Sequence, residues 1–107
     1  MPKMASSDRV NMRRREYSLD LTVNRKRITK VVVDPHYEEK HSSSIDDEII
    51  LRLVQMLDGK FVEPDVEDPP FNYFSQDQIG LNGKFYKLIW LLEENESYIG
   101  VINAYRR

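Results

Sequence analysis

This sequence of 107 residues contains no cysteine, only two histidines and no long apolar run. Without cysteine, a disulfide framework, a thiolate metal site and a cysteine nucleophile are all excluded. The longest apolar run is Leu88–Leu92, far shorter than the roughly 20 residues that a membrane-spanning helix needs, and the first residues have no apolar signal core. These absences predict a soluble protein of the cytoplasm with no membrane partner.

The composition that remains suits one compact domain. Hydrophobic residues make up 40% of the chain and charged residues 32%, which is too apolar for a disordered chain and sufficient for one core. Residues 1–15 show no periodic apolar face. We therefore predict a flexible basic arm over residues 1–15 and a single folded domain over residues 16–107.

Charge is distributed unevenly along the chain. Residues 1–33 hold nine Lys/Arg against three Asp/Glu, a net charge of +6, whereas residues 34–107 hold seven against fifteen, a net charge of −8. The acidic stretch 63–70 is interpreted as a solubilising loop that its prolines keep out of a helix. The basic groups either contact phosphates or an acidic partner, or are a solvated terminus and a charged turn. They are Arg13, Arg14, Arg15, Arg25, Lys26 and Arg27.

The first half of the chain predicts a hairpin followed by a helix. Apolar and polar residues alternate over 17–23, and the β-branched stretch 28–33 reads as the returning strand. A short helical segment is expected over 36–41. The main helix is expected over about 45–58, with Ser44 as its N-cap and Gly59 just past its end.

The second half predicts further antiparallel strands. Asn82-Gly83 is the residue pair that a type I′ hairpin turn favours. The expected strands cover residues 71–74, 78–81, 84–92 and 97–105, with 84–92 central and buried on both faces at its end. The fold class is therefore α+β, an antiparallel sheet of about four to six strands with the main helix and a short helical segment packed on one face.

Few residues can carry chemistry, and the two histidines are the first to consider. On a helix His36 and His41 lie about 140° apart around the axis, so they do not form a zinc pair and no metal site is expected. His36 and Lys40 are four residues apart and share a face, an arrangement suited to proton transfer beside a phosphate. The alternative is that both histidines are helix-surface residues beside Glu38 and Glu39.

The predicted last strand carries a second group of candidates. Strict alternation places Val101, Asn103 and Tyr105 on one face and Ile102, Ala104 and Arg106 on the other. Asn103 and Tyr105 could then form a place where a base stacks, with arginine at the rim for phosphate. The alternative is an ordinary strand that ends in solubilising charge.

Taken together, these segments resemble a known family. The stretch Lys40-His41-Ser42-Ser43-Ser44-Ile45 leads into an amphipathic helix, and the last strand ends Ile102-Asn103-Ala104-Tyr105-Arg106. Over residues 28–107 this pattern resembles the BrnT-like ribonuclease toxins of bacterial toxin-antitoxin pairs and, more broadly, the RelE-like fold. The resemblance implies a helical part packed on a small antiparallel sheet, RNA cleavage without a metal or other cofactor, and a cognate antitoxin protein as partner.

With that resemblance, the expected reaction is attack of a ribose 2′-hydroxyl on its own phosphate. We expect His36 or His41 to transfer protons, Lys40 and Arg106 to stabilise charge, and Tyr105 to stack on a base or act as an acid. Further RNA contacts are expected from Arg13, Arg14, Arg15, Arg25, Lys26, Arg27, Tyr86 and Arg107. The alternative function is a non-enzymatic protein-interaction or nucleic-acid-binding module, in which these side chains are scattered around an exposed apolar patch.

Overall fold

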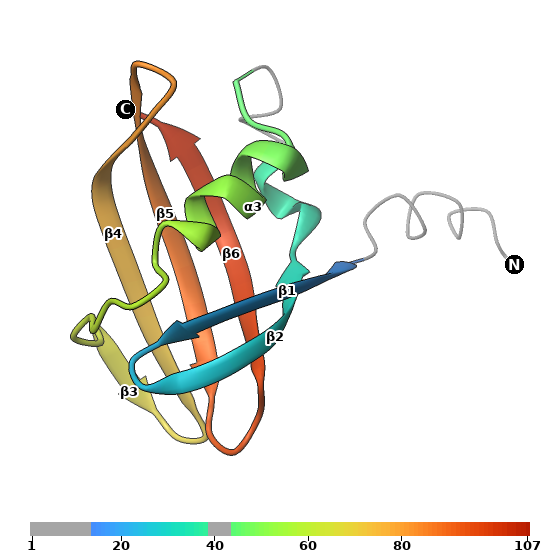
Figure 1. Ribbon diagram of the computed structural model, residues 1–107, viewed down its shortest axis with the longest axis vertical. Coiled ribbons are helices and arrows are strands. Elements are labelled where there is room, and N and C mark those ends of the chain that lie inside the picture. Colours follow the sequence, from blue (N-terminus) through green and yellow to red (C-terminus); the bar gives the residue numbers. More distant parts are fainter. Residues whose placement is uncertain (1–13, 39–43) are drawn as a thin grey trace, which may run out of the picture.

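The computed structural model describes residues 14–38 and 44–107, which form a sheet of six strands with one α-helix on one face (Figure 1). This confirms the predicted α+β class. The helices in this part of the chain are too short and too polar to cross a membrane. In chain order the elements are β1 (Arg15–Val23), β2 (Lys26–Val33), the 3-10 helix η1 (Pro35–Tyr37), α3 (Asp47–Gln55), β3 (Val66–Asp68), β4 (Phe71–Leu81), β5 (Lys84–Glu93) and β6 (Tyr98–Arg106).

The strand order in the sheet is β1-β2-β6-β5-β4-β3. All neighbours are antiparallel except β2 and β6, which pair in parallel over Lys30–Val33 and Tyr98–Val101. The β1–β2 hairpin runs across β4, β5 and β6 at a steep angle, so the sheet curls around the face that also carries α3 (Figure 1). We call this the inner face and the opposite one the outer face.

The core lies between the inner face of the sheet and α3. Phe74 of β4 stacks on Trp90 of β5 with ring centroids 5.3 Å apart, and both rings are buried. Burial of large apolar side chains is the main favourable term in folding. The fully buried side chains of the helix and the sheet that meet here are Ile50, Leu53, Val54, Val23, Ile28, Val31, Val33, Leu88, Trp90 and Ile99.

Two tight turns join the hairpins. Asn82 and Gly83 both have positive φ, 54° and 76°, as a type I′ turn requires, which confirms the predicted turn between β4 and β5. Asn24 and Arg25 have the same signs, 53° and 61°, between β1 and β2. Both turns therefore match the twist of the strands that they connect.

The main helix is shorter than the sequence predicted. The helix begins at Asp47 rather than at residue 45 because Asp46, not Ser44, is its N-cap: the Asp46 side chain accepts a hydrogen bond from the Ile49 N–H at 2.9 Å. It ends at Gln55, and residues 56–59 form turns. The segment predicted over 36–41 is a 3-10 helix over Pro35–Tyr37, and residues 39–43 lie outside the described part of the chain.

Three strands contain an extra residue that simple alternation did not predict. In β1 it falls between Ser18 and Leu21, the partners of Lys30 and Ile28 in β2. The stretches 71–74 and 78–81 belong to one strand, β4, whose pairing with β5 slips between Gln76 and Ile79. In β6 the slip falls at Ile102, between the partners of Ile89 and Trp90. Because of it, Val101 and Ala104 are both buried, contrary to the prediction that they lie on opposite faces.

Arg15 was predicted to end the flexible arm, but it is the first residue of β1. Its guanidinium pairs with Asp47 and with Glu38, so the start of β1 is tied to η1 and α3. Asp47 also accepts hydrogen bonds from the hydroxyls of Tyr17 and Tyr37. Burial alone would raise the pKa of Asp47, but the hydrogen bonds from Arg15 and the two tyrosines outweigh it and lower that pKa.

Candidate nucleic-acid interface

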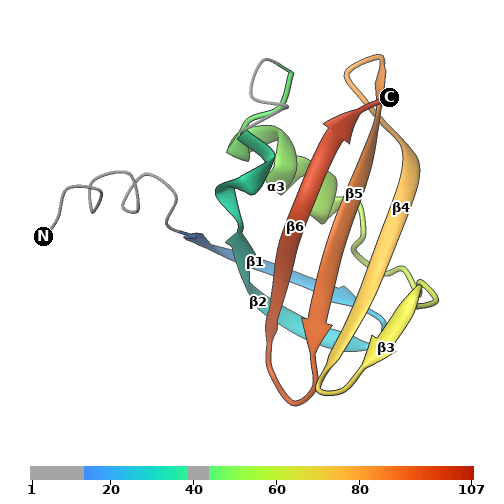
Figure 2. The same ribbon diagram turned by 180° about the vertical axis from the view of Figure 1, so that it is seen from behind.

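The outer face of β4, β5 and β6 is crossed by no described helix or strand (Figure 2). Every second residue of β5 points to it, and the register places β4 and β6 side chains beside them. The aromatic and aliphatic side chains on this face are partly exposed: Phe71, Tyr73, Ile89, Leu91, Tyr98, Ile102 and Tyr105, with Phe85 more than half exposed. An open sheet face of this composition is typical of a binding surface.

Tyr105 is the centre of one group on this face. It is directly opposite Lys87 in the β5–β6 register. The Arg107 guanidinium lies over the Tyr105 ring, 5.8 Å from its centroid, and its Nε is 3.1 Å from an Asp77 carboxylate oxygen. The Tyr105 ring and the cations of Lys87 and Arg107 are therefore neighbours on the outer face.

Charge changes sign along the strands. At the end where β4 turns into β5 and β6 stops, which we call the Arg106 end, the chain carries Lys84, Lys87, Arg106 and Arg107. Lys87 and Arg107 lie on the outer face, where Arg107 pairs with Asp77, whereas Arg106 is opposite the inward Tyr86 in the register. At the opposite end the chain carries Glu67, Asp68, Glu93, Glu94 and Glu96. An anionic ligand is therefore attracted to the Arg106 end and repelled from the other.

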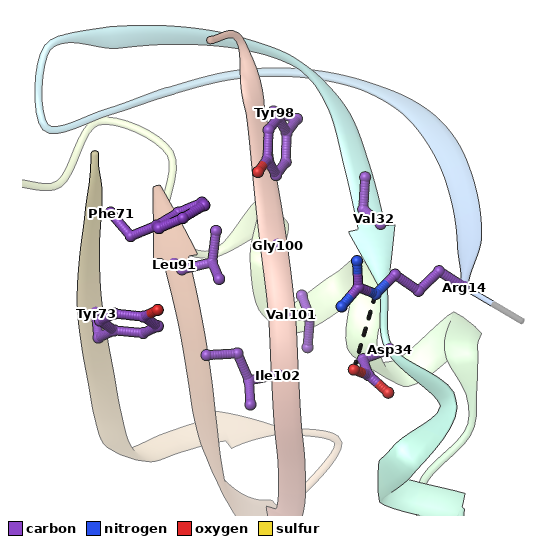
Figure 3. A pocket seen from close by; sticks show the side chains of 10 residues that line it. All are labelled: Arg14, Val32, Asp34, Phe71, Tyr73, Leu91, Tyr98, Gly100, Val101 and Ile102. Carbon is purple, nitrogen blue, oxygen red and sulfur yellow. Dashed lines mark ion pairs between the residues drawn. The ribbon is translucent and has the colours of Figure 1, made fainter. Parts of the chain in front are cut away.

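A groove of about 270 Å³ opens between these two ends on the outer face (Figure 3). Phe71, Tyr73 and Leu91 lie on one side of it and Tyr98 and Ile102 on the β6 side. Arg14 reaches toward Gly100 from the start of β1, with the Asp34 carboxylate beside it (Figure 3). The Arg14 Nε and the nearer Asp34 oxygen are 3.9 Å apart, so the two form an ion pair that is wider than a hydrogen bond.

Two features fix the side chains around this groove. Gly100 is buried, and a Cβ added to it would come within 3.0 Å of Leu91 Cδ1, so only glycine fits beside the Leu91 side chain at this point. The Tyr98 hydroxyl donates to Glu93 Oε1 at 2.6 Å, which holds the ring in place. Burial and this hydrogen bond raise the pKa of Tyr98 to about 12, so the hydroxyl stays protonated at neutral pH.

The predicted basic residues do not form one surface. At the β1–β2 turn, far along the chain from Tyr105, the Arg25 guanidinium lies over the Phe61 ring and Lys26 donates to the carbonyls of Glu93 and Glu96. Arg27 pairs with Asp20 on the same hairpin. Of the predicted RNA contacts, the structure brings Arg14, Tyr105 and Arg107 to the outer face and holds Arg15 in the Asp47 cluster instead.

The prediction that Tyr86 contacts RNA is wrong. Only 3% of Tyr86 is exposed, because its side chain points to the inner face of the sheet together with those of Leu88 and Trp90. The prediction that β5 is buried on both faces at its end is also wrong, since Ile89 and Leu91 are partly exposed on the outer face.

The predicted catalytic set is only partly described. His36 lies in η1, which packs beside β6, and Arg106 is exposed at the end of β6. Lys40, His41 and Arg13 lie outside the described residues. Within residues 14–38 and 44–107, no three His, Asp or Glu side chains are grouped so as to hold a metal ion.

Sequence reasoning overlooked Lys87, Tyr73 and Tyr98. Lys87 could have been found from the alternation along β5. Its neighbours Tyr86 and Leu88 point to the inner face, so Lys87 points to the outer face, where it pairs with Tyr105 of the last strand. Tyr73 and Tyr98 line the same groove only because β4 and β6 flank β5, and this strand order is not visible in a local pattern.

Neither protein-family models, nor curated proteins, nor solved structures match this chain.

Proposed function

We propose that this protein is a metal-independent ribonuclease of the toxin type that binds a single RNA strand on the outer face of β4, β5 and β6. The observation that carries the proposal is the Tyr105 ring, paired with Lys87 and covered by Arg107, on an open sheet face. Aromatic rings on such a face stack on unpaired bases, and neighbouring cations contact the phosphates.

The charge distribution supports a defined direction of binding. The net charge of the chain is −2, which by itself disfavours a polyanion. Lys87 and Arg107, however, lie beside Tyr105 on the outer face at the Arg106 end, so phosphates lie there while bases extend over the tyrosines toward the groove. A duplex does not fit this arrangement, because its bases are stacked on one another and offer no free faces.

Cleavage requires a base, an acid and cations for the charge that develops on the phosphate. Lys87 and Arg107 supply cations on the outer face at the Arg106 end, and the exposed Arg106, opposite Tyr86 in the register, is the third predicted cation at the end of β6. His36 and His41 remain the predicted proton-transfer groups, and η1 carries His36 along the edge of β6. A cognate antitoxin protein that restrains the activity belongs to the same proposal.

The test is binding and cleavage of a fluorescent single-stranded oligouridine by the full chain in the presence of EDTA. Wild type should bind and cleave it, and Lys87→Ala and Tyr105→Ala should each weaken binding about tenfold, since each removes one phosphate or stacking contact. Lys60→Ala is the matched control, because Lys60 is an exposed lysine in the segment between α3 and β3. No binding by wild type, or equal binding by all variants, would refute the proposal.

A second candidate function rests on the apolar part of the same face. Leu91 and Ile102 line the groove and are partly exposed, a composition that also suits a segment of another protein. If RNA is neither bound nor cleaved while Leu91→Asp abolishes association with a genomically adjacent small protein, the chain is a non-enzymatic interaction module.

A further inference from the structure

A cavity of about 470 Å³ opens on the inner face, at the end of the sheet opposite the Arg106 end. The buried Phe74 and Leu92 form its floor, and Asn72 shares their face because it is directly opposite Leu92 in the β4–β5 register. Phe61 and Pro64 line it from the segment between α3 and β3, which runs beside this end of the sheet (Figure 1). We call it the Phe61 cavity. Apolar side chains and polar groups that converge on a cavity of this size are typical of a binding site.

Phe61 is an exposed ring on a fixed backbone. Its side chain is 62% exposed, and the Arg25 guanidinium lies 5.8 Å from its centroid. The Asn24 amide donates to the Val62 carbonyl at 2.9 Å and accepts from the Val62 N–H at 2.7 Å. The Asn24 N–H also donates to the Lys60 carbonyl at 2.9 Å. The ring is therefore held in place before a ligand arrives, which lowers the entropic cost of binding.

The rim of the Phe61 cavity is acidic. Glu67 is directly opposite Asn72 in the β3–β4 register, so its exposed carboxylate lies on the face of the cavity, and the exposed Glu94 lines the cavity itself. Lys26 also lines it, but its ammonium already donates to two backbone carbonyls, and Arg25 is engaged by an aromatic ring. Cationic ligands are therefore attracted to this rim and phosphates are repelled.

We propose that the Phe61 cavity binds an extended basic segment of a partner protein. One large apolar side chain of this segment packs between Phe61 and Leu92, and its lysine or arginine side chains pair with Glu67 and Glu94. Within residues 14–38 and 44–107 the Asn72 side chain has no hydrogen-bond partner, so its amide is available to the backbone of the segment. The inference does not depend on the proposed ribonuclease, because the cavity and the RNA face lie on opposite sides of the sheet.

The test is an NMR titration of the full chain with three end-blocked peptides, Lys-Lys-Phe-Lys-Lys, Lys-Lys-Ala-Lys-Lys and Glu-Glu-Phe-Glu-Glu. The first should bind about tenfold or more tightly than the other two, because only it has both the ring and the positive charge. It should also shift the Asn72 side-chain amide and the Phe61 backbone amide of the wild-type protein, a readout that needs no variant. Equal affinities for the three peptides, or shifts confined to other residues, would overturn the proposal.

Two variants and a matched control locate the contacts. Phe61→Ala should weaken the Lys-Lys-Phe-Lys-Lys peptide about tenfold, and Glu67→Gln about threefold, the value of one exposed ion pair. Asp68→Asn is the control, because Asp68 is the exposed neighbour of Glu67 but is opposite Phe71 in the register and so lies on the outer face. Thermal melts of the three variants verify that each is folded. Equal effects of Glu67→Gln and Asp68→Asn would overturn the assigned rim.

Two further titrations distinguish other occupants of the cavity. Oligouridine that shifts the Asn72 side-chain amide would assign the cavity to nucleic acid, and shifts of this amide on dilution without peptide would assign it to a second copy of the chain. Either result would overturn the proposal. Peptide binding by a protein that does not bind oligouridine refutes the RNA-binding proposal alone, and oligouridine binding by a protein that does not prefer the basic aromatic peptide refutes this inference alone.

Discussion

Arg15 and Asp47 form a two-point ion pair, with Arg15 Nε 2.5 Å from Asp47 Oδ2 and Arg15 Nη2 3.0 Å from Oδ1. The pair joins the first residue of β1 to the first turn of α3. Because Asp47 also accepts from Tyr17 and Tyr37, one carboxylate holds β1, η1 and α3 together. The chain that follows η1 and leads into α3 includes Lys40 and His41, so this cluster fixes both ends of the segment on which they lie.

Asp47→Asn should lower the free energy of unfolding by about 2 kcal/mol, since hydrogen bonds to charged groups contribute about 1.5–3 kcal/mol. The single side-chain oxygen of asparagine cannot replace the two carboxylate oxygens that accept from Arg15, Tyr17 and Tyr37. Chemical denaturation measures the loss. Glu48→Gln is the control, because Glu48 is an exposed neighbour in an i,i+4 pair with Arg52 and should change stability by less than about 0.5 kcal/mol. Equal losses in the two variants would show that the contacts of Asp47 contribute no more to stability than the surface ion pair of Glu48.

The same cluster predicts how stability depends on pH. The pKa of Asp47 is lowered from its ordinary value of 3.8, so its stabilising contribution is complete above that value and is lost as the pH falls through the lower folded pKa. Denaturation at a series of acid pH values should therefore show a steeper fall for wild type than for Asp47→Asn. Parallel pH profiles would mean that Asp47 titrates alike in the folded and unfolded chain.

The β4–β5 turn provides a test of the backbone. Gly83 has φ +76°, and Gly83→Ala should cost about 1 kcal/mol because an L side chain in the left-handed region costs about 1–2 kcal/mol. Gly80 precedes the same turn with an ordinary φ, so Gly80→Ala should be close to neutral in the same thermal melts. A neutral Gly83→Ala would argue against a type I′ turn.

Arg106 is exposed at the end of β6 and should act on RNA rather than on the fold. Arg106→Ala should weaken binding or cleavage of oligouridine about tenfold to hundredfold, the value of one charge-assisted phosphate contact. Its denaturation midpoint should stay at the wild-type value. A fully active and fully stable Arg106→Ala protein would remove Arg106 from the site.

The histidines are tested in living cells. Expression of the wild-type chain should arrest bacterial growth and degrade total RNA, and replacing His36 and His41 together by Ala should restore growth, because the variant lacks the predicted acid and base. Lys60→Ala should remain toxic. Growth and intact RNA with the wild type would refute the ribonuclease proposal and favour the interaction module.

Local signals in the sequence predicted much of the fold. The Asn82-Gly83 pair marked its hairpin turn because few residues adopt positive φ twice in succession. The apolar spacing of Ile45, Ile49, Leu53, Val54 and Leu57 predicted the buried side of the helix, and Leu53 and Val54 are fully buried, whereas Ile50 takes the buried position expected for Ile49. The parallel pairing of β2 with β6 was beyond prediction, since it joins strands separated by nearly the whole domain.

The candidate site was predictable only in part, for the same reason. Asn103 and Tyr105 share the outer face as alternation indicated, but the extra residue at Ile102 turned Val101 inward. Arg14 and Asp34 line the same groove as Gly100 because β2 pairs with β6. A site assembled from strand ends far apart in the sequence has no local motif to reveal it.

The most direct measurement of RNA binding on the outer face is an NMR titration of methyl-labelled protein with a short single-stranded oligoribonucleotide. Ile89, Leu91 and Ile102 report on the outer face, and Ile50, Leu53 and Ile99 report on the buried side of the same fold. We expect the first three methyl groups to shift with added RNA and the second three to stay in place. Shifts confined to the second group, or no shift at all, would contradict RNA binding on this face.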